Sequence, residues 1–429
     1  MNLLVPSPAR NYFYQSFVSY AHSFLFKNFL TKIKYGHLIV DIKDTNFPQY
    51  IGTPSFKYGD DKGEVKARIQ IINLYRFFFK VLFGGDVGFS ESFILGDFVC
   101  DDLKNLITIF ILNRNELDNF NTKWSFVMDG VNRLAHYLHR NTIEGSKENI
   151  KAHYDLSNEM FSLFLDKTMS YSCAYFDHRE QDLESAQMNK IRKLIDKANL
   201  TPDCELLEIG SGWLELAIEA VRRTGCRVTT VSLSQQQISY GLKKVEEAGL
   251  SDRITILYKD YRHIEGKFDR IISCEMLEAV GYENYPSYFQ ALERLLKPNG
   301  IFVVQFITFK DQDFHGLIKR CDFIQKYIFP GGLLPSITSI MEAATNHSNL
   351  VLQHAETFGT HYAITLDIWK KNFFENKDKI LALGFDQQFI NMFDYYFCYC
   401  SAAFETRTIN LIQMQFSRPC NVNLNDFKK

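Results

Sequence analysis

The sequence predicts an α/β fold whose larger part is an open, mostly parallel sheet. From about residue 183 onward, stretches with helical spacing alternate with short apolar runs, and this order of elements builds a parallel sheet. A glycine turn, Gly210-Ser211-Gly212, follows the first apolar run, as expected where a strand turns sharply into a helix. Near the C-terminus, Ile412 to Phe416 alternates apolar residues with glutamines, which is typical of an antiparallel edge strand.

The first predicted helices and strands lie on both sides of the glycine turn. Met188, Ile191 and Ile195 recur at helical spacing and predict a helix before the first strand. Ser234 suits the N-terminal cap of a later helix, and Gly249 suits its end. In chain order, the expected elements after the first helix are a strand over 206–209, a helix over 214–222, a strand over 228–233 and the helix over 234–249.

The next part of the chain continues the sheet. Two strands are expected over 254–258 and 268–274, followed by a helix near 285–296. The turn Pro298-Asn299-Gly300 ends this helix and leads into a strand over 301–308. In an open α/β sheet, ligands bind beyond the carboxyl ends of the strands, so the chemistry is expected there.

The composition is that of a globular protein with an excess of aromatic residues. The chain has 429 residues, enough for two or three domains, and its 48 basic and 50 acidic side chains leave no strong field for nucleic acid. Nine cysteines without a Cys-x-x-Cys pair indicate neither a disulfide framework nor a zinc site, and they favour a reducing, cytoplasmic location. No metal site is expected. Apolar runs fall short of the roughly 18 residues that span a bilayer.

The first forty residues are rich in aromatic and basic side chains and contain no acid before Asp41. Phe13, Phe17 and Tyr20 share one face of a predicted helix. Two interpretations stay open, because a helix lying in a membrane interface and an amphipathic helix packed on its own domain show the same stripe. A polar stretch near 140–150 predicts a smaller, mainly helical, lipid- or membrane-contacting domain over 1–145 and a second domain over 146–429.

Candidate binding residues follow each of the first parallel strands. An acid after the third strand can accept a hydrogen bond from an adenine amino group, and a ring beside it can stack on the base. Neither a full Gly-x-Gly-x-x-Gly turn nor a phosphate-binding loop is present, which disfavours NAD and nucleoside triphosphates. In strand order, the candidates are Gly210 and Gly212, the stretch 232–237, Asp260 with Tyr261, and Glu275 with Glu278.

Several longer motifs occur between residues 150 and 419. They are HYDLSN (153–158), SYSCAYF (170–176), KYIFPGG (326–332), YAITL (362–366) with Trp369, and the region near Phe404. Together they resemble the cyclopropane fatty acyl phospholipid synthase family, and SCEMLEAVG (273–281) looks most like the C-terminal half of the long plant-type enzymes. The resemblance implies a class I Rossmann-like methyltransferase sheet and an S-adenosylmethionine-dependent methyltransferase domain over 146–429.

The implied reaction transfers a methyl(ene) group from S-adenosylmethionine to the cis double bond of a phospholipid acyl chain and forms a cyclopropane ring. Attack by the alkene leaves a carbocation, and a base must then remove a proton from the added methyl group. Water would divert the cation to an alcohol, so an apolar pocket rich in aromatic faces is expected. The implied partner is an unsaturated phospholipid at a membrane surface. The implied enzyme is cytoplasmic and peripheral to the membrane, and a second copy of the chain, in a homodimer, is a further candidate partner.

The resemblance also implies which residues assist the proton transfer. In the bacterial relatives the base is thought to be bicarbonate, and the side chains that would hold it correspond here to Cys173, Glu278, Tyr362 and Gln305. Gln305 stands where those relatives have a histidine, so it can donate a hydrogen bond to an anion but cannot relay its proton. Judged by residue spacing alone, Cys173 and Tyr362 would also fit positions in the core. Glu278 would also fit the exposed surface of a helix.

Nine positions match the family's cofactor contacts. They are Tyr171, Ser172, Gly210, Gly212, Ser232, Leu233, Gln237, Asp260 and Tyr261. Leu214 departs from the family's Gly-Cys-Gly-Trp-Gly turn, and its side chain is expected to crowd the helix or narrow the methionine end of the cofactor site.

Three functional hypotheses follow. The first is a cyclopropane-forming lipid methyltransferase. The second makes a methyl-branched or otherwise modified lipid, and it stays open because Gln305 changes how protons are handled. The third is a non-catalytic lipid-binding relative, which only Leu214 supports.

Overall fold

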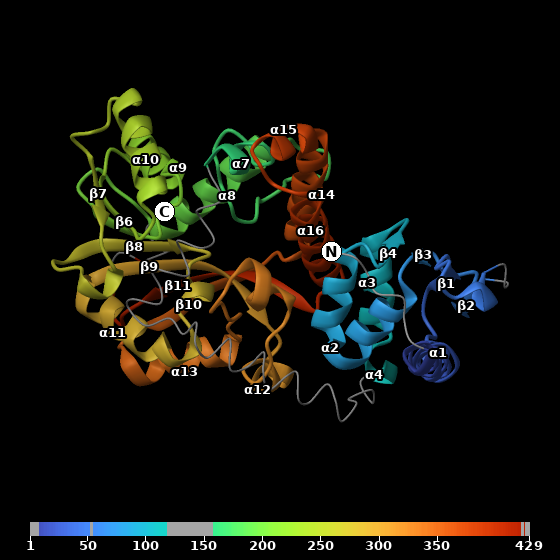
Figure 1. Cartoon of the computed structure of the whole chain (residues 1–429). Helices are drawn as coiled ribbons and strands as arrows, with labels where there is room; N and C mark the ends of the chain where they lie inside the picture. Colours follow the sequence, from blue (N-terminus) through green and yellow to red (C-terminus); the bar gives the residue numbers. More distant parts are fainter. Residues whose placement is uncertain (1–7, 52–54, 118–157, 422–423, 425–429) are drawn as a thin grey trace. The chain divides into compact units, whose positions relative to one another are not determined.

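The computed structural model describes residues 8–51, 55–117, 158–421 and 424 (Figure 1). The chain divides into two compact units. The first comprises Met1–Leu134 and Gly384–Thr406, and the second comprises Ala135–Leu383 and Arg407–Lys429. The domain boundary expected near residue 146 lies outside the described residues, as does the HYDLSN motif except its final Asn158.

The first unit combines the expected helices with a small four-stranded sheet. The strands lie in the order β2-β1-β3-β4, with β1 and β3 parallel and the other pairs antiparallel. The strands are β1 (His37–Ile42), β2 (Phe56–Gly59), β3 (Lys66–Ile71) and β4 (Phe98–Cys100). The helices are α1 (Pro8–His22), α2 (Leu74–Ile94), α3 (Leu103–Leu112), α4 (Arg114–Leu117) and α16 (Gln387–Glu405).

Helix α16 belongs to the first unit although it lies far along the sequence, and the sequence analysis does not anticipate this placement. Asn391 donates a hydrogen bond to the carbonyl of Ile94 in α2 at 3.0 Å. Lys104 of α3 pairs with Glu405 at 2.9 Å. The first unit is therefore assembled from two separate parts of the chain.

Helix α1 has both buried and exposed side chains. Val18 and Ala21 are fully buried, and the Phe17 ring stacks on Phe83 of α2 with centroids 6.3 Å apart. Tyr20 remains 66% exposed and stacks on Phe24. One face of α1 thus packs on its own unit while Tyr20 stays in solvent, so neither sequence interpretation of this helix is excluded.

The second unit contains the expected open α/β sheet. Its seven strands lie in the order β10-β11-β9-β8-β5-β6-β7. The five strands from β9 to β7 in this order run parallel, β11 pairs antiparallel with β9, and β10 pairs antiparallel with β11. The strands are β5 (Glu205–Ile209), β6 (Arg227–Ser232), β7 (Ile254–Tyr258), β8 (Phe268–Cys274), β9 (Leu296–Phe309), β10 (Val351–Thr357) and β11 (Ile409–Ser417). The expected turn at residues 298–300 lies within β9, at a break in its register with β8.

Helices cover both faces of this sheet, as Figure 1 shows. Leu206 packs in a core with α8 and α9, whereas Leu207 and Ile209 pack in a core with α11 and α13, because successive strand residues point to opposite faces. The helices are α7 (Asn158–Ser162), α8 (Leu183–Ala198), α9 (Glu215–Thr224), α10 (Gln235–Glu247), α11 (Tyr285–Leu295), α12 (Phe314–Leu317), α13 (Ile337–His347), α14 (Thr360–Glu375) and α15 (Lys377–Ala382).

Two details of the sequence prediction are tested by this sheet. Ser234 caps α10 as expected, its side-chain oxygen accepting a hydrogen bond from the N–H of Gln237 at 3.3 Å. Strand β11 is antiparallel as expected, but it is not the edge strand, because β10 pairs outside it. Gln413 of β11 is fully buried, so the alternating glutamines do not mark a solvent face.

Among the described residues, no helix combines the length and apolarity needed to cross a bilayer.

Candidate active site

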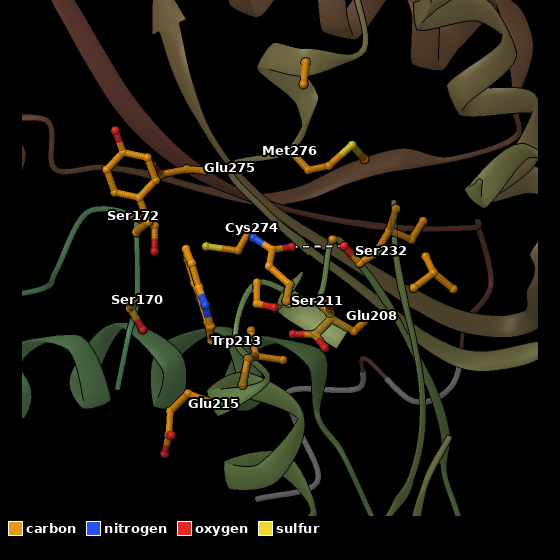
Figure 2. Close-up of a pocket in the computed structure, with 18 of the residues that line it drawn as sticks. Ser170, Ser172, Glu208, Ser211, Trp213, Glu215, Ser232, Cys274, Glu275 and Met276 are labelled. Carbon is orange, nitrogen blue, oxygen red and sulfur yellow. Dashed lines mark hydrogen bonds between the residues drawn. The ribbon is translucent and has the colours of Figure 1, made fainter. Parts of the chain in front are cut away.

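A pocket opens at the carboxyl ends of the parallel strands, where the sequence predicts ligand binding. Figure 2 shows part of its lining, with Glu208 in β5, Ser232 at the end of β6 and Glu275 directly after β8. All nine cofactor candidates line this pocket, namely Tyr171, Ser172, Gly210, Gly212, Ser232, Leu233, Gln237, Asp260 and Tyr261. The fold therefore gathers residues from distant parts of the sequence at one place.

The glycine turn forms one wall of the pocket. Gly210 and Gly212 have φ angles of 92° and 46°, which side chains disfavour. The N–H groups of Gly210 and Ser211 both donate to the carbonyl of Val231 at 3.1 Å and fix the turn beside β6. A Cβ atom at Gly210 would lie 3.2 Å from the side chain of Met276. The turn thus presents bare backbone that a ligand can approach closely.

Leu214 does not crowd the pocket. Its side chain is fully buried in the core between the sheet, α8 and α9, and it is not among the residues that line the pocket. It packs instead on Gly241 of α10, where a Cβ atom would lie 2.2 Å from Leu214 Cδ1. The expected narrowing of the cofactor site is therefore not observed, because a glycine on the facing helix makes room.

Two groups at the ends of β6 and β7 are fixed by hydrogen bonds. Ser232 donates to the side-chain oxygen of Gln237 at 3.0 Å (Figure 2). Asp260 accepts from Nε and Nη2 of Arg262 at 2.9 and 2.7 Å. Burial alone would raise the pKa of Asp260, but the hydrogen bonds from Arg262 outweigh it and lower the pKa. Asp260 thus stays a carboxylate that can accept a hydrogen bond from an amino group.

Lys190 is a pocket residue that the sequence analysis missed. Its side chain, on α8, is buried, and Nζ donates to Ser172 Oγ at 2.7 Å. Glu208 lines the same pocket. A buried ammonium group on a pocket wall is suited to bind a ligand carboxylate. Helical spacing places Lys190 on the same face as Gln187 and Leu194, but only the structure shows that this face is buried.

Three of the four residues expected at the proton-transfer site meet around Glu275. Its Oε1 accepts from the backbone N–H of Cys173 at 2.9 Å and from Nε2 of Gln305 at 2.6 Å. Its Oε2 accepts from the hydroxyl of Tyr362 at 2.8 Å. Burial raises the pKa of Glu275, and the three hydrogen bonds oppose that shift. Cys173 contributes its backbone, since burial raises the pKa of its thiol well above the usual value.

Glu278, the fourth expected residue, has the charge of Glu275 nearby but accepts its hydrogen bond from a different donor. Its Oε1 accepts from the N–H of Ile307 at 2.6 Å. Its Oε2 is buried and has no hydrogen-bond partner among the described residues. Burial and the neighbouring charge of Glu275 both raise the pKa of Glu278. An acid with one donor and an unpaired buried oxygen favours its neutral form.

Aromatic rings surround this part of the site. Tyr171 lies 5.3 Å from Trp369 and 6.2 Å from Phe329, measured between ring centroids. Tyr362 lies edge-on to Trp369 at 6.1 Å, and Phe161 lies 5.1 Å from Tyr171. Ring faces attract positive charge, so this cluster can stabilise a cation while it excludes water.

Comparison with known proteins identifies the family. A family model described as mycolic acid cyclopropane synthetase matches residues 141–414. The chain belongs to this family. A tuberculostearic acid methyltransferase of Mycobacterium tuberculosis is 37% identical over 78% of this chain and 79% of its own length. The cyclopropane-fatty-acyl-phospholipid synthase of Escherichia coli K12 is 36% identical over 83% of this chain and 89% of its own length.

The solved structures agree with this family assignment. A mycolic acid cyclopropane synthase, described as complexed with SAH and CTAB, superposes with a TM-score of 0.59 at 30% identity, covering 63% of this chain and 98% of its own. The resemblance seen in the motifs is thereby confirmed, and the second unit has the fold of S-adenosylmethionine-dependent methyltransferases.

One feature of this cyclopropane synthetase family member differs from the expectation. The donors expected to hold bicarbonate already hold the carboxylate of Glu275, and Glu278 adds a second acid beside it. A further anion would be repelled by the charge and would find its donors taken. The residues present therefore do not fit bicarbonate. The sequence predicts Glu275 at a strand end but indicates no role for it.

Proposed function

We propose that this protein transfers a methyl group from S-adenosylmethionine to the cis double bond of an unsaturated phospholipid acyl chain and closes a cyclopropane ring there. One observation carries the proposal. A single pocket is lined both by the nine cofactor candidates and by Glu275, which belongs to a hydrogen-bonded and aromatic cluster suited to a transient cation. Family membership supports the same reaction class.

The pocket residues fit S-adenosylmethionine in three ways. Asp260 can accept from the adenine amino group beside the Tyr261 ring, since Arg262 keeps it ionised. Ser232 and Gln237 offer a hydroxyl and an amide to ribose hydroxyls. Lys190 can pair with the methionine carboxylate. These are proposed contacts. The backbone of the glycine turn forms the remaining wall of the proposed cofactor site.

When bound, S-adenosylmethionine supplies an electrophilic methyl group on a sulfonium centre. The residues of this chain orient the acyl double bond toward it and keep water away. The Tyr171 ring, which lines the pocket and packs against Trp369 and Phe329, stabilises the carbocation in the acyl chain. Ring closure then requires a base beside the added methyl group.

A methyl-branched product is the second candidate. It is favoured by the similarity to a relative named tuberculostearic acid methyltransferase, at 37% identity. It would arise if the cation lost a proton from a neighbouring carbon of the acyl chain, so that the electrons of that C–H bond form a double bond beside the methyl branch. A non-catalytic role loses its support, because Leu214 packs into the core and not into the pocket.

We also propose that the protein works as a peripheral, cytoplasmic enzyme on membrane phospholipids. Tyr20 of α1 and Phe79 of α2 are 66% and 47% exposed in the first unit. Exposed aromatic side chains partition into the membrane interface, and Lys27 and Lys32 follow α1 with no acid nearby in sequence. This surface is the proposed membrane contact.

Lipid mass spectrometry of an expressing host fed methyl-labelled methionine tests the proposal. A labelled acyl chain heavier by one methylene, without branched-chain fragmentation, is expected. Branched fragments would instead support the second candidate. Absence of labelled lipid, together with absence of S-adenosylmethionine binding by calorimetry, would contradict both.

A further inference from the structure

The carboxylate of Glu275 is held in a defined orientation by donors from three separate parts of the chain. Cys173 lies in the segment between α7 and α8, Gln305 lies in β9, and Tyr362 lies in α14. Among the described residues, Oε1 accepts two hydrogen bonds, whereas Oε2 accepts one, from Tyr362. Oε2 therefore retains a lone pair that can accept a proton.

The residue also reaches the place where the chemistry is proposed. Glu275 lines the cofactor pocket, and Figure 2 shows it together with Ser172 and Met276 on the wall. Its backbone has φ of 48°, a left-handed conformation that residues with a Cβ atom rarely adopt. Such strain is retained where the surrounding structure fixes a side chain for a purpose.

A row of hydrogen bonds that crosses β11 and β9 ends at the Glu275 carboxylate. Cys274 of β8 pairs with Gln305 of β9, which pairs with Gln413 of β11. The Gln413 amide donates to the side-chain oxygen of Gln305 at 2.8 Å, and Lys197 donates to the side-chain oxygen of Gln413. Every donor in this row points toward Glu275. The two aligned amide dipoles stabilise the carboxylate at the end of this row, while Lys197 at the far end is itself paired with Glu356 at 2.6 Å.

Glu278 has the opposite environment. It receives one hydrogen bond, from Ile307, and its second oxygen is buried without a partner among the described residues. Two neighbouring acids whose surroundings differ in this way divide the roles, one staying ionised and the other neutral. The geometry makes Glu275 the ionised member.

We propose that Glu275 is the resident base of the reaction and takes the place that bicarbonate holds in the bacterial relatives. This inference rests on the proposed function. The alkene electron pair forms a bond to the methyl carbon, and the carbon–sulfur bond breaks with its electrons remaining on sulfur. Glu275 Oε2 then takes a proton from the added methyl group, and the electron pair of that C–H bond closes the ring. Glu275 is left protonated and returns the proton to water after product release.

The test uses the purified full chain with S-adenosylmethionine and vesicles of an unsaturated phospholipid. Buffer is freed of carbon dioxide by degassing, and the initial rate is compared with that after addition of bicarbonate. The wild-type rate is expected to change by less than about twofold, because the base belongs to the protein. As a readout independent of turnover, ¹³C NMR of labelled bicarbonate is expected to show no binding to the wild-type protein.

Two matched variants accompany the wild type. Glu275→Gln keeps the size of the side chain and an acceptor oxygen for Cys173 and Gln305, while its amide nitrogen can donate to the Tyr362 hydroxyl. It cannot take a proton, so we expect product formation to fall by about 100-fold or more with unchanged S-adenosylmethionine affinity by calorimetry. Glu278→Gln makes the same change three residues away and mimics a neutral acid. Product formation by this variant should therefore fall by less than about tenfold. Glu275→Asp should recover part of the lost activity.

The outcomes separate the two proposals. A wild-type protein that makes product only with bicarbonate, or that binds it by NMR, overturns the role of Glu275 while leaving the proposed function intact. Retained activity in Glu275→Gln, or an equal loss of cofactor affinity, also overturns it. A wild-type protein that methylates no lipid under either condition overturns the proposed function and this inference with it.

Discussion

At the scale of single residues, Glu208 and Asp260 show how the pocket controls charge. Both acids line it, yet their pKa values move in opposite directions. Burial raises the pKa of Glu208 to about 8, against an opposing hydrogen bond from Thr230 at 2.5 Å. Burial is outweighed at Asp260 by the two bonds from Arg262. A guanidinium partner, and not depth alone, thus decides which acid is ionised.

Glu208 should make stability depend on pH. Its folded-state pKa lies above its ordinary value of 4.5, so the native state holds a proton that the unfolded state releases between 4.5 and about 8. Stability contributed by this group is therefore present below 4.5 and is lost as pH rises to about 8. Glu208→Gln should flatten this slope and stabilise the ligand-free protein at pH 8 by on the order of a few kcal/mol. Urea unfolding across this pH range measures it, and parallel slopes for both proteins would contradict the assignment.

Sequence motifs located most site residues but not the one that organises them. Tyr171, Ser172, Cys173 and Tyr362 occur in recognisable strings, and the family resemblance implies Gln305 and the other cofactor candidates. The structure places the cofactor candidates around one pocket and the other three residues beside Glu275. Glu275 follows a strand within one such string, yet its role depends on partners at 173, 305 and 362. Lys190 likewise acts through the distant Ser172. Long-range pairing of this kind is set by the fold and leaves no local pattern.

At the scale of secondary-structure elements, the start of α9 depends on its fit to α10. Leu214 sits at φ 70° before α9 and fills the space beside Gly241. Gly241→Ala should destabilise the protein by about 1–3 kcal/mol, because the new Cβ atom would overlap the buried Leu214 side chain. Leu214→Gly alone should cost about 2–5 kcal/mol, because it leaves a cavity in the core. In the double variant the alanine methyl group occupies part of that cavity without a clash, so the double variant should lose less stability than the sum of the two single changes. Thermal unfolding of the three variants measures the coupling, and simple additivity would show that the two residues do not interact.

Elements with clear periodicity were predicted well, and those stabilised by distant partners were not. The parallel strands and their helices appear near the expected residues, because apolar runs and caps are local features. The position of β11 inside the sheet was not predicted, since its glutamines resemble a solvent face. Gln413 is buried because Gln305 and Lys197 satisfy its amide. Helix α16 joins the first unit for the same kind of reason, through partners such as Ile94.

At the scale of the whole molecule, the aromatic surplus divides between the core, the site and an exposed surface of the first unit. Tyr20 and Phe79 are the exposed members proposed to contact lipid. The double variant Tyr20→Ser with Phe79→Ser should weaken cosedimentation with anionic phospholipid vesicles by about tenfold or more, given the free energy of burying aromatic surface. Leu242→Ser, which changes a 55% exposed side chain of α10, serves as the control. An equal effect of both changes would contradict a specific membrane surface.

The central claim, ring closure on an acyl chain, is tested most directly by the fate of the methyl hydrogens. The purified protein is supplied with S-adenosylmethionine carrying a fully deuterated methyl group and with vesicles of an unsaturated phospholipid, and the acyl product is analysed by mass spectrometry. Loss of one methyl hydrogen to the base predicts a product that retains two deuterium atoms in a cyclopropane ring. A product that retains all three in a methyl branch, or an unlabelled lipid, would contradict the account.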